Sequence, residues 1–252
     1  PMTDKKRDLE GMKELFSNPD FKPDMLKIYP TMVSKGTALY TEYENGTFVP
    51  LSAKDAAAMI VKFKKHVPEY CRIMRIQRDI PTKQWAAGVE MTNFRQYISE
   101  NYKMECNCIR CREPRGREID WNSVKLKVDK YKASKGTEFF ISVEDTKNNI
   151  LVGFVRMRFP HEFLRKEITK DSALIRELHV YGTATAIGDI GKVQHRGWGK
   201  KLMQEAEDIA IQNKKNKMVV ISGIGVREYY YNIGYKKEGP YVTKDLKQSK
   251  PE

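Results

Sequence analysis

The chain has 252 residues, and its 46 lysines and arginines exceed its 33 aspartates and glutamates by a formal charge of +13. This length is enough for one large or two ordinary domains, each with a core that needs no disulfide. The basic balance favours a polyanionic partner such as RNA or DNA over a merely solvated lysine-rich surface. No segment approaches the ~20 apolar residues of a membrane span, and the first residues lack an apolar signal segment. We therefore expect a cytoplasmic protein that has no membrane partner.

The first hundred residues alternate between helical and extended patterns. Apolar residues at helical spacing predict helices over residues 5–17 and 53–66, and Ser52 is the expected N-cap of the second helix. An extended segment over 21–30 and a strand over 71–78 flank that helix in the sequence, and a further helix is expected near 93–102. This succession favours α/β units of a parallel sheet or barrel.

Five arginines between residues 72 and 112 are candidates for RNA contacts. In a strand, Arg72 and Arg78 would lie on one face and Arg75 on the other. Contacts to RNA phosphates and ordinary solvent-exposed or ion-paired arginines explain the pattern equally well. The candidate RNA-binding residues are Arg72, Arg75, Arg78, Arg110 and Arg112.

Three of the four cysteines follow the pattern C-x-C-x-x-C at residues 106–111. Three thiolates within six residues can ligate one tetrahedral zinc ion, and such a cluster suits a reducing compartment better than disulfides do. A fourth ligand must come from elsewhere, and Cys71 and His66 are the nearby candidates. The predicted metal ligands are Cys106, Cys108, Cys111 and Cys71. Three free thiols and an iron–sulfur cluster are the alternatives.

From residue 121 onwards the pattern changes to strands. They are expected over residues 125–131, 138–144, 150–158, 173–182, 217–222 and 241–244, with a hairpin turn at 146–149. Between the fourth and fifth of these strands lies the loop 194–200, with the pattern Q-x-x-G-x-G, followed by an amphipathic helix. Gly197 and Gly199 let the backbone approach a ligand, and the N–H groups at the start of a helix favour an anion such as pyrophosphate.

A tyrosine-rich segment, residues 229–231, follows the fifth of these strands. The order strand, glycine loop, helix, strand, tyrosine-bearing helix resembles the acetyl-coenzyme A binding core of the GNAT acetyltransferases. Several longer motifs resemble the catalytic subunit of Elongator, a family of tRNA uridine carboxymethyltransferases. These motifs lie at residues 26–31, 75–81, 92–95, 108–113, 176–182, 193–199, 220–223, 227–230 and 233–235.

The resemblance implies an α/β fold in three parts. Residues 1–100 would be the C-terminal part of a radical S-adenosylmethionine type α/β barrel, residues 101–118 a zinc-binding linker, and residues 119–252 a GNAT-type acetyl-coenzyme A binding domain. The family's S-adenosylmethionine and [4Fe–4S] cluster would be held by residues that are not in this chain. We therefore expect a fragment of a longer protein, with zinc and acetyl-coenzyme A as the cofactors of this part.

The resemblance also places a donor site. The pantetheine would lie along residues 177–180, where parting strands free backbone groups, and the pyrophosphate would lie on residues 194–200. The cofactor-binding candidates are Glu177, Leu178, His179, Val180, Gln194, Arg196, Gly197, Trp198, Gly199, Lys200 and Tyr230.

The catalytic candidates are Tyr229, Tyr230 and Glu177. A tyrosine hydroxyl can donate to the thioester or protonate a departing thiolate, whereas Glu177 can act as a base only if it faces the thioester. Not all of Tyr229, Tyr230 and Tyr231 can face one site from a helix. Within an apolar strand, His179 is expected to be a core histidine, and His195 is expected to be a surface loop residue.

Three functions compete. The first is acetyl-coenzyme A dependent formation of 5-carboxymethyluridine at the tRNA wobble position, with tRNA-stimulated hydrolysis of the donor. The second is a protein lysine acetyltransferase, and the third is a zinc-stabilised RNA-binding module without catalysis. The expected partners are tRNA and acetyl-coenzyme A, and the resemblance allows a homodimer or Elongator-type subunits.

Overall fold

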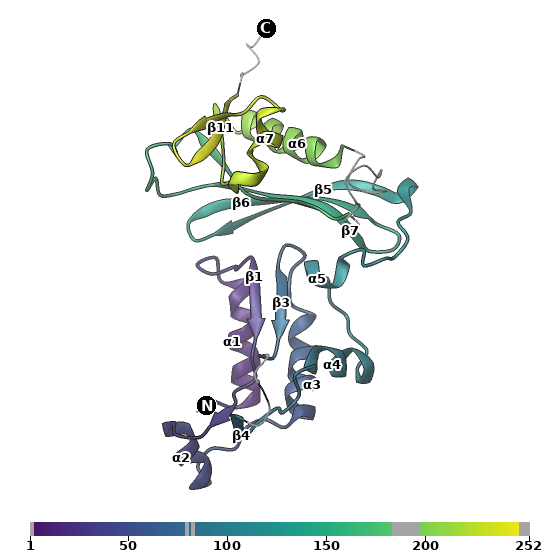
Figure 1. Ribbon diagram of the computed structural model, residues 1–252, viewed down its shortest axis with the longest axis vertical. Coiled ribbons are helices and arrows are strands. Elements are labelled where there is room, and N and C mark those ends of the chain that lie inside the picture. Colours follow the sequence, from purple (N-terminus) through teal and green to yellow (C-terminus); the bar gives the residue numbers. More distant parts are fainter. Residues whose placement is uncertain (1–2, 79–80, 82–83, 183–196, 247–252) are drawn as a thin grey trace. The chain divides into compact units, whose positions relative to one another are not determined.

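The structure is a computed structural model that describes residues 3–78, 81, 84–182 and 197–246 (Figure 1). The chain divides into two compact units, Pro1–Cys111 and Arg112–Glu252. The segment 101–118, predicted as a separate linker, is thus shared between the two units.

The first unit contains helices and short strands. In chain order its elements are α1 (Lys5–Ser17), β1 (Met25–Ile28), β2 (Val33–Ser34), α2 (Ala38–Glu44), α3 (Ala53–Lys64), β3 (Arg72–Ile76), β4 (Trp85–Ala87), α4 (Phe94–Asn101) and α5 (Ile109–Arg112), whose last residue belongs to the second unit. Strands β1 and β3 pair in parallel, as the helix and strand succession predicts, and β2 pairs with β4 antiparallel.

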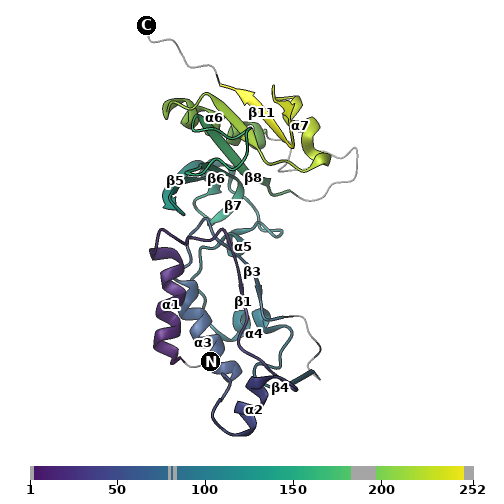
Figure 2. The ribbon, with the colours of Figure 1, turned by 90° about the vertical axis from the view of Figure 1, so that its left-hand side faces the viewer.

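The sequence of α3 explains both where the helix begins and which of its faces is buried. The Ser52 side chain accepts a hydrogen bond from the Asp55 amide, which satisfies one of the free N–H groups at the helix start. Ala56, Ile60 and Phe63 recur at helical spacing and are buried. Helices α1 and α3 lie side by side, and the rings of Phe16 and Phe63 are 6.1 Å apart between centroids (Figure 2). The predicted N-cap and both predicted helices are confirmed.

The second unit is built on a seven-stranded sheet with the order β10-β11-β9-β8-β7-β6-β5. Its elements are a 3-10 turn (Trp121–Ser123), β5 (Val124–Ala133), β6 (Gly136–Asp145), β7 (Ile150–Phe159), β8 (Ser172–Val180), α6 (Trp198–Gln212), β9 (Lys217–Val220), a second 3-10 turn (Ile224–Val226), α7 (Arg227–Tyr231), β10 (Lys236–Glu238) and β11 (Tyr241–Asp245). Strands β8 and β9 are parallel, and every other neighbouring pair in this sheet is antiparallel.

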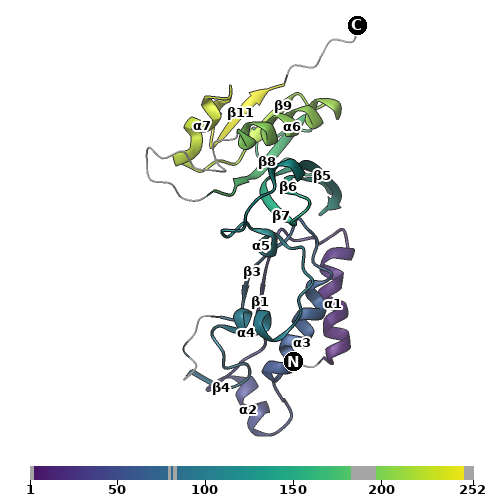
Figure 3. The same cartoon turned by 90° about the vertical axis from the view of Figure 1, so that its right-hand side faces the viewer.

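Helix α6 packs across β6, β7 and β8 on one face of this sheet (Figure 3). The face predicted to be apolar is buried, and its members are Leu202, Met203, Ala206, Ile209 and Ala210. They pack with sheet residues such as Ile141, Val155 and Ile175 in one core. Burial of each large aliphatic side chain contributes roughly 1.5–3 kcal/mol, so this helix is fixed against the sheet. The predicted order strand, helix, strand, tyrosine-bearing helix is confirmed.

Candidate functional site

The parallel strands β8 and β9 pair only over their first residues. Their register runs from Ser172 opposite Lys217 to Ile175 opposite Val220, and the Ile221 amide donates the next hydrogen bond to the Ile175 carbonyl. Strand β8 continues to Val180, and there its described strand neighbour is β7 alone. The predicted parting of the sheet at residues 177–180 is therefore present. Backbone groups on that edge can bind an extended ligand that carries amides.

Helix α6 begins beside this opening. Its N-cap is Gly197, whose φ of 71° lies in the left-handed region that glycine adopts without strain. Trp198, Gly199 and Lys200 form the first turn, and the Lys201 ammonium lies 4.3 Å from the centre of the Trp198 ring. The free N–H groups, the helix dipole and two lysines together make this end suitable for a phosphate. Gln194, His195 and Arg196 of the predicted loop lie outside the described residues.

Tyr229, from α7, lies against the start of α6. An ideal Cβ atom on Gly199 would lie 2.8 Å from the Tyr229 hydroxyl oxygen and 3.9 Å from a Val180 methyl carbon. The backbone of Gly199 is thus in close approach to both the tyrosine and the parted strand. This packing brings together three residues of the predicted site that are far apart in the sequence.

Buried polar atoms gather on the elements around this opening. The Trp198 Nε1, Ser222 Oγ and Tyr229 hydroxyl atoms are buried and have no hydrogen-bond partner among the described residues. A buried polar group without a partner costs free energy, so such groups in a native protein point to a water or a ligand that satisfies them. The residues present therefore fit a bound polar molecule such as acetyl-coenzyme A.

The three consecutive tyrosines occupy different environments, as predicted. Tyr230 is buried in the core, and its ring contacts the rings of Tyr229 and Tyr235 at centroid distances of 5.2 and 5.8 Å. Tyr231 is exposed. Burial, with a smaller contribution from Tyr229, raises the pKa of Tyr230 to about 12, and burial also raises the pKa of Tyr229. Both hydroxyls thus keep their protons at neutral pH and can donate.

Glu177 lies on the opposite face of β8 from Leu178, which packs against the core. Its carboxylate accepts a hydrogen bond of 2.8 Å from Nε of Arg156, a buried residue that is its cross-strand partner on β7. A carboxylate that is ion-paired with a buried guanidinium is fixed in place, which suits a positioning role better than proton transfer. To act as a base, Glu177 would have to give up part of this ion pair.

His179 is not a core histidine, contrary to the expectation from its apolar strand. Its side chain is exposed, and its ring lies 5.9 Å from the ring of Phe154 and 4.4 Å from that of Tyr181. The expectation fails because β8 has one face against α6, and His179 lies on the other face with Glu177.

The cysteine cluster is brought together in the first unit. The sulfur atoms of Cys106, Cys108 and Cys111 all lie within 4.8 Å of one another. Two sulfurs bound to one tetrahedral zinc ion are about 3.8 Å apart, given a Zn–S distance of ~2.3 Å, so small side-chain adjustments suffice to bind it. Hydrogen bonds from the Cys106 and Cys111 thiols, helped by the charge of Lys64, hold the pKa of Cys108 below its usual range. These residues therefore fit zinc.

The fourth ligand is not apparent in this arrangement. Cys71 is buried and lies outside the group, although its carbonyl accepts a hydrogen bond of 2.9 Å from the Ile109 amide. His66 is exposed and also lies outside it. Nζ of the buried Lys64 approaches the Cys111 sulfur at 3.5 Å, which places a positive charge beside the thiols.

The five predicted RNA-binding arginines differ in exposure. Arg75 and Arg78 are exposed, and the Arg78 guanidinium lies 5.3 Å from the centre of the Tyr29 ring. Arg72 and Arg110 are half-buried. Arg112 is buried and ion-pairs with Glu144 at 2.8 Å, so the structure argues against an RNA contact for this residue.

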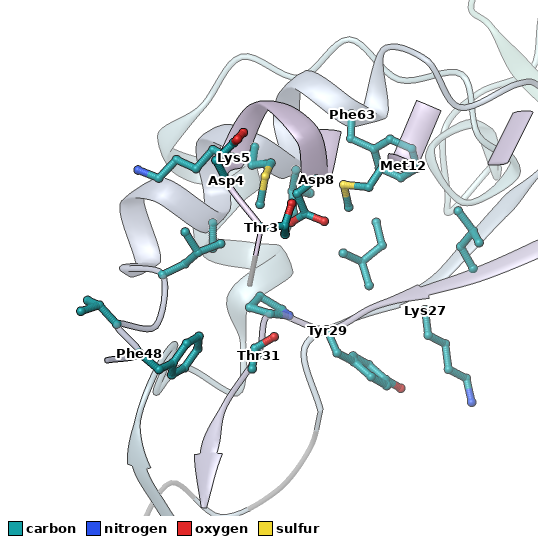
Figure 4. Close-up of a pocket in the computed structure, with 18 of the residues that line it drawn as sticks. Thr3, Asp4, Lys5, Asp8, Met12, Lys27, Tyr29, Thr31, Phe48 and Phe63 are labelled. Atoms are coloured by element: carbon teal, nitrogen blue, oxygen red, sulfur yellow. The ribbon is translucent and has the colours of Figure 1, made fainter. Parts of the chain in front are cut away.

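A cavity of about 540 Å³ lies in the first unit, between α1, β1, α3 and the segment 47–51. Figure 4 shows that Asp8 and Met12 from α1, Tyr29 and Phe48 are among the side chains around it. None of the residues predicted for the donor site, the metal site or RNA binding lines this cavity.

Several interactions at the candidate sites were missed from the sequence. Arg156 had no role assigned, yet it holds Glu177, and Lys64 had none, yet it approaches Cys111. Ser222 was predicted only as the end of a strand. A basic residue within an apolar strand, as Arg156 is, was the one available signal of a buried ion pair.

Comparison with known proteins first defines the class. Residues 23–104 match the family described as the Radical_SAM C-terminal domain. Together with the seven-stranded unit and its parted parallel strands, this match confirms the predicted fold class. The chain is an α/β protein in which part of a radical S-adenosylmethionine type domain precedes a unit built on a seven-stranded sheet.

Close relatives then define the family. The chain is 42% identical over 259 residues to a tRNA uridine(34) acetyltransferase of Methanocaldococcus jannaschii, covering 98% of this chain and 48% of the relative. It is 39% identical over 254 residues to human Elongator complex protein 3, covering 96% of this chain and 46% of the relative. A solved structure of Methanocaldococcus infernus Elp3 with an N-terminal deletion superposes with a TM-score of 0.89 at 42% identity, covering 98% of this chain and 61% of that one.

The predicted resemblance is confirmed. Over the part that it shares with them, the chain is similar in sequence and fold to the tRNA uridine(34) acetyltransferases and Elongator complex proteins 3. It spans about half the length of these relatives. No helix within the described ranges combines the length and apolar composition that a bilayer crossing requires.

Proposed function

We propose that this chain is the acetyl-coenzyme A binding part of an enzyme that forms 5-carboxymethyluridine at the wobble position of tRNA. The observation that supports this most directly is the parting of β8 from β9 beside the start of α6, in a chain at least 39% identical to proteins named for tRNA uridine(34) modification and Elongator. The proposed parts are residues 1–100 as barrel, 101–118 as zinc-binding linker and 119–252 as donor domain. The proposed location is the cytoplasm, where reducing conditions keep the cysteines as thiols.

The residues of the second unit would share the binding of the donor. The pyrophosphate would lie at the start of α6, against Gly197 to Lys200, with Gln194 and Arg196 of the preceding loop. The pantetheine amides would pair with the free edge of β8 over residues 177–180. This assignment uses the anion preference of a helix start and the unpaired groups of a strand edge.

Two tyrosine hydroxyls would act at the thioester. When water attacks the thioester carbon, the departing sulfur needs a proton, and a protonated tyrosine can donate one. Burial raises the pKa of both Tyr229 and Tyr230, so each hydroxyl carries its proton at neutral pH, and the proton that the attacking water loses would replace the one donated. S-adenosylmethionine and a [4Fe–4S] cluster, held outside this chain, would supply the radical that activates the acetyl methyl group. Glu177 would position Arg156 and the strand edge.

The test compares three tyrosine variants of the enzyme that contains this chain. Tyr229→Phe and Tyr230→Phe should each lower tRNA-stimulated hydrolysis of acetyl-coenzyme A, by about tenfold or more if the hydroxyl is the general acid. The exposed Tyr231→Phe is the matched control and should have parental activity. The affinity for tRNA should stay within about twofold in all three, since the phosphate contacts are unchanged. Parental hydrolysis by both Tyr229→Phe and Tyr230→Phe would remove these hydroxyls from the mechanism.

For the metal, we propose one zinc ion on Cys106, Cys108 and Cys111, with Cys71 as the fourth ligand to be tested. Elemental analysis should find about one zinc per chain, and Cys108→Ser should lose it while acetyl-coenzyme A binding is retained. The Cys71→Ser variant tests whether Cys71 is the fourth ligand, because the substitution lowers zinc occupancy only if Cys71 binds the ion. Less than about half a zinc in the parent protein would contradict a cysteine site.

The donor domain is also compatible with a protein lysine acetyltransferase. The net charge of +13 disfavours basic, histone-like peptides, because like charges repel. Incubation of labelled acetyl-coenzyme A with tRNA and with peptides distinguishes the two activities. The name of the human relative leads us to propose further Elongator-type subunits, and a homodimer is the alternative assembly.

A further inference from the structure

One edge of the seven-stranded sheet carries a dense row of lysines. Strand β5 is the terminal strand, and its sequence VKLKVDKYKA contains four lysines and one aspartate (Figure 1). The turn that follows adds Lys135. Every one of these five lysines is exposed. Side chains alternate along the strand, so Lys125 and Lys127 lie on one face of this edge and Lys130 and Lys132 on the other. From Lys125 to Lys132 the edge extends for about 24 Å, because a strand rises ~3.4 Å per residue.

The charge of this row is largely uncompensated. Lys125, Lys130, Lys132 and Lys135 make no ion pair with any described carboxylate; Lys132 donates to the Thr137 hydroxyl at 2.8 Å, and Lys130 lies over the Phe139 ring. The acidic side chains on the neighbouring strand are already used. Glu138 ion-pairs with both Arg158 and Arg176, and Glu144 ion-pairs with Arg112.

Three lysines on other strands of the sheet do have carboxylate partners. Lys217 pairs with Glu238 at 2.6 Å, Lys244 with Glu207 at 2.7 Å, and Lys236 on the opposite edge strand β10 with Asp245 at 2.8 Å. On the opposite edge strand β10, Lys236 thus has a carboxylate partner, whereas Lys125, Lys130, Lys132 and Lys135 have none among the described residues. Uncompensated like charges in a row repel one another and attract a polyanion.

We propose that strand β5 and its turn form a binding surface for the phosphate backbone of tRNA. The inference rests on the proposed function in that tRNA is taken as the RNA, but it needs neither the donor site nor the metal. Phosphate contacts fix orientation without reading sequence, so this surface would hold the tRNA body. Lysines also protect edge strands from pairing with other chains, which is the main competing explanation.

The experiment measures tRNA affinity of the 252-residue chain as a function of salt concentration. Lys125→Gln/Lys132→Gln should weaken binding roughly threefold to tenfold near 0.1 M salt. It should also lower the magnitude of the slope of log K against log salt by about 1.4–1.8, since each of the two lost phosphate contacts removes about 0.7–0.9. Lys125→Arg/Lys132→Arg keeps the charge and should bind as the parent does. Lys236→Gln/Lys237→Gln removes the same charge from the opposite edge strand and should change the slope little.

The possible outcomes distinguish the proposed tRNA surface on β5 from the proposed function of the chain. If Lys125→Gln/Lys132→Gln keeps the parental salt slope, or if Lys236→Gln/Lys237→Gln lowers that slope equally, the tRNA surface is not on β5. That conclusion holds whether or not the enzyme modifies tRNA. If the β5 variant self-associates in sedimentation while its tRNA affinity is unchanged, the lysines protect the edge and the inference is overturned. If the parent chain does not bind tRNA at all, this inference and the tRNA role of the chain both fail. Retained acetyl-coenzyme A binding would then leave the donor site intact.

Discussion

The contact between Gly199 and Tyr229 shows how a single atom can couple two elements of the proposed donor site. In the Gly199→Ala variant, the added Cβ would meet the tyrosine oxygen at 2.8 Å, which is too close, whereas the next ring carbon is 3.6 Å away. Alanine has the better helix propensity, by up to about 1 kcal/mol, so propensity alone predicts stabilisation. The close contact predicts the opposite, a loss of about 1–3 kcal/mol from overpacking.

A double-mutant cycle in chemical denaturation decides between these effects. Gly199→Ala should destabilise the parent but be neutral or stabilising in a Tyr229→Phe background, where the oxygen is gone. The coupling free energy should be at least about 0.5 kcal/mol, as is usual for residues in contact. Equal effects of the glycine substitution in both backgrounds would show that the two side chains do not meet.

At the scale of elements, the turn between β6 and β7 is held by one buried carboxylate. Asp145 accepts hydrogen bonds from the Asp120 amide at 2.9 Å, from the Asn148 side chain at 2.9 Å and from the Ser123 hydroxyl. Burial opposes ionisation, but these hydrogen bonds outweigh it and hold the pKa of Asp145 well below its ordinary value. Because the unfolded chain binds the proton more tightly, this group stabilises the fold above about pH 4, and the stabilisation is lost as the pH falls further.

Asp145→Asn should therefore lower the free energy of unfolding at pH 7 by about 2–4 kcal/mol, the range for losing charge-assisted hydrogen bonds in a buried site. The difference from the parent should shrink as the pH is lowered from 5 to 3, measured by urea denaturation at each pH. Asp245→Asn, which removes an exposed carboxylate from a surface ion pair, is the control and should change stability little at any pH. A parent-to-variant difference that does not change with pH would contradict the role of the Asp145 charge.

Elements with strong local signals were predictable, and those defined by distant pairing were not. Helix α6 has its apolar spacing, and the β6–β7 hairpin has two largely apolar runs and a turn in which Asn149 adopts a φ of 51°, as asparagine can. Strands β2 and β4 have two and three residues, which is too short for periodicity, and they were missed together with α2 and β10.

The candidate site shows the same difference between features with a local sequence pattern and contacts between distant residues. Residues 177–180 and 197–200 and the tyrosines could be selected from motifs and a family resemblance. The contacts that these residues make could not be predicted, because Arg156 and Glu177 are 21 residues apart in the sequence, and Lys64 and Cys111 are 47 apart. Such pairs depend on strand register and packing, which a local pattern does not contain.

At the scale of the whole molecule, the features that would bind the donor belong to one unit. The parted edge of β8, the start of α6 and the tyrosines of α7 all lie in Arg112–Glu252. Residues 23–104, in contrast, match a radical S-adenosylmethionine C-terminal domain, and the chain covers about half of its relatives. Donor binding and radical chemistry should therefore be separable by experiment.

We predict that a polypeptide of these 252 residues binds acetyl-coenzyme A within about threefold of the affinity of a version extended to the length of the relatives, because its donor contacts are the same. With tRNA, S-adenosylmethionine and a reductant it should form no carboxymethyluridine, since it lacks ligands for the cluster that the family resemblance implies. Calorimetry measures the first quantity, and mass spectrometry of tRNA nucleosides measures the second. If the shorter chain binds the donor more than about tenfold more weakly, part of the donor site lies outside it. If the shorter chain forms modified uridine, the radical chemistry resides within these residues.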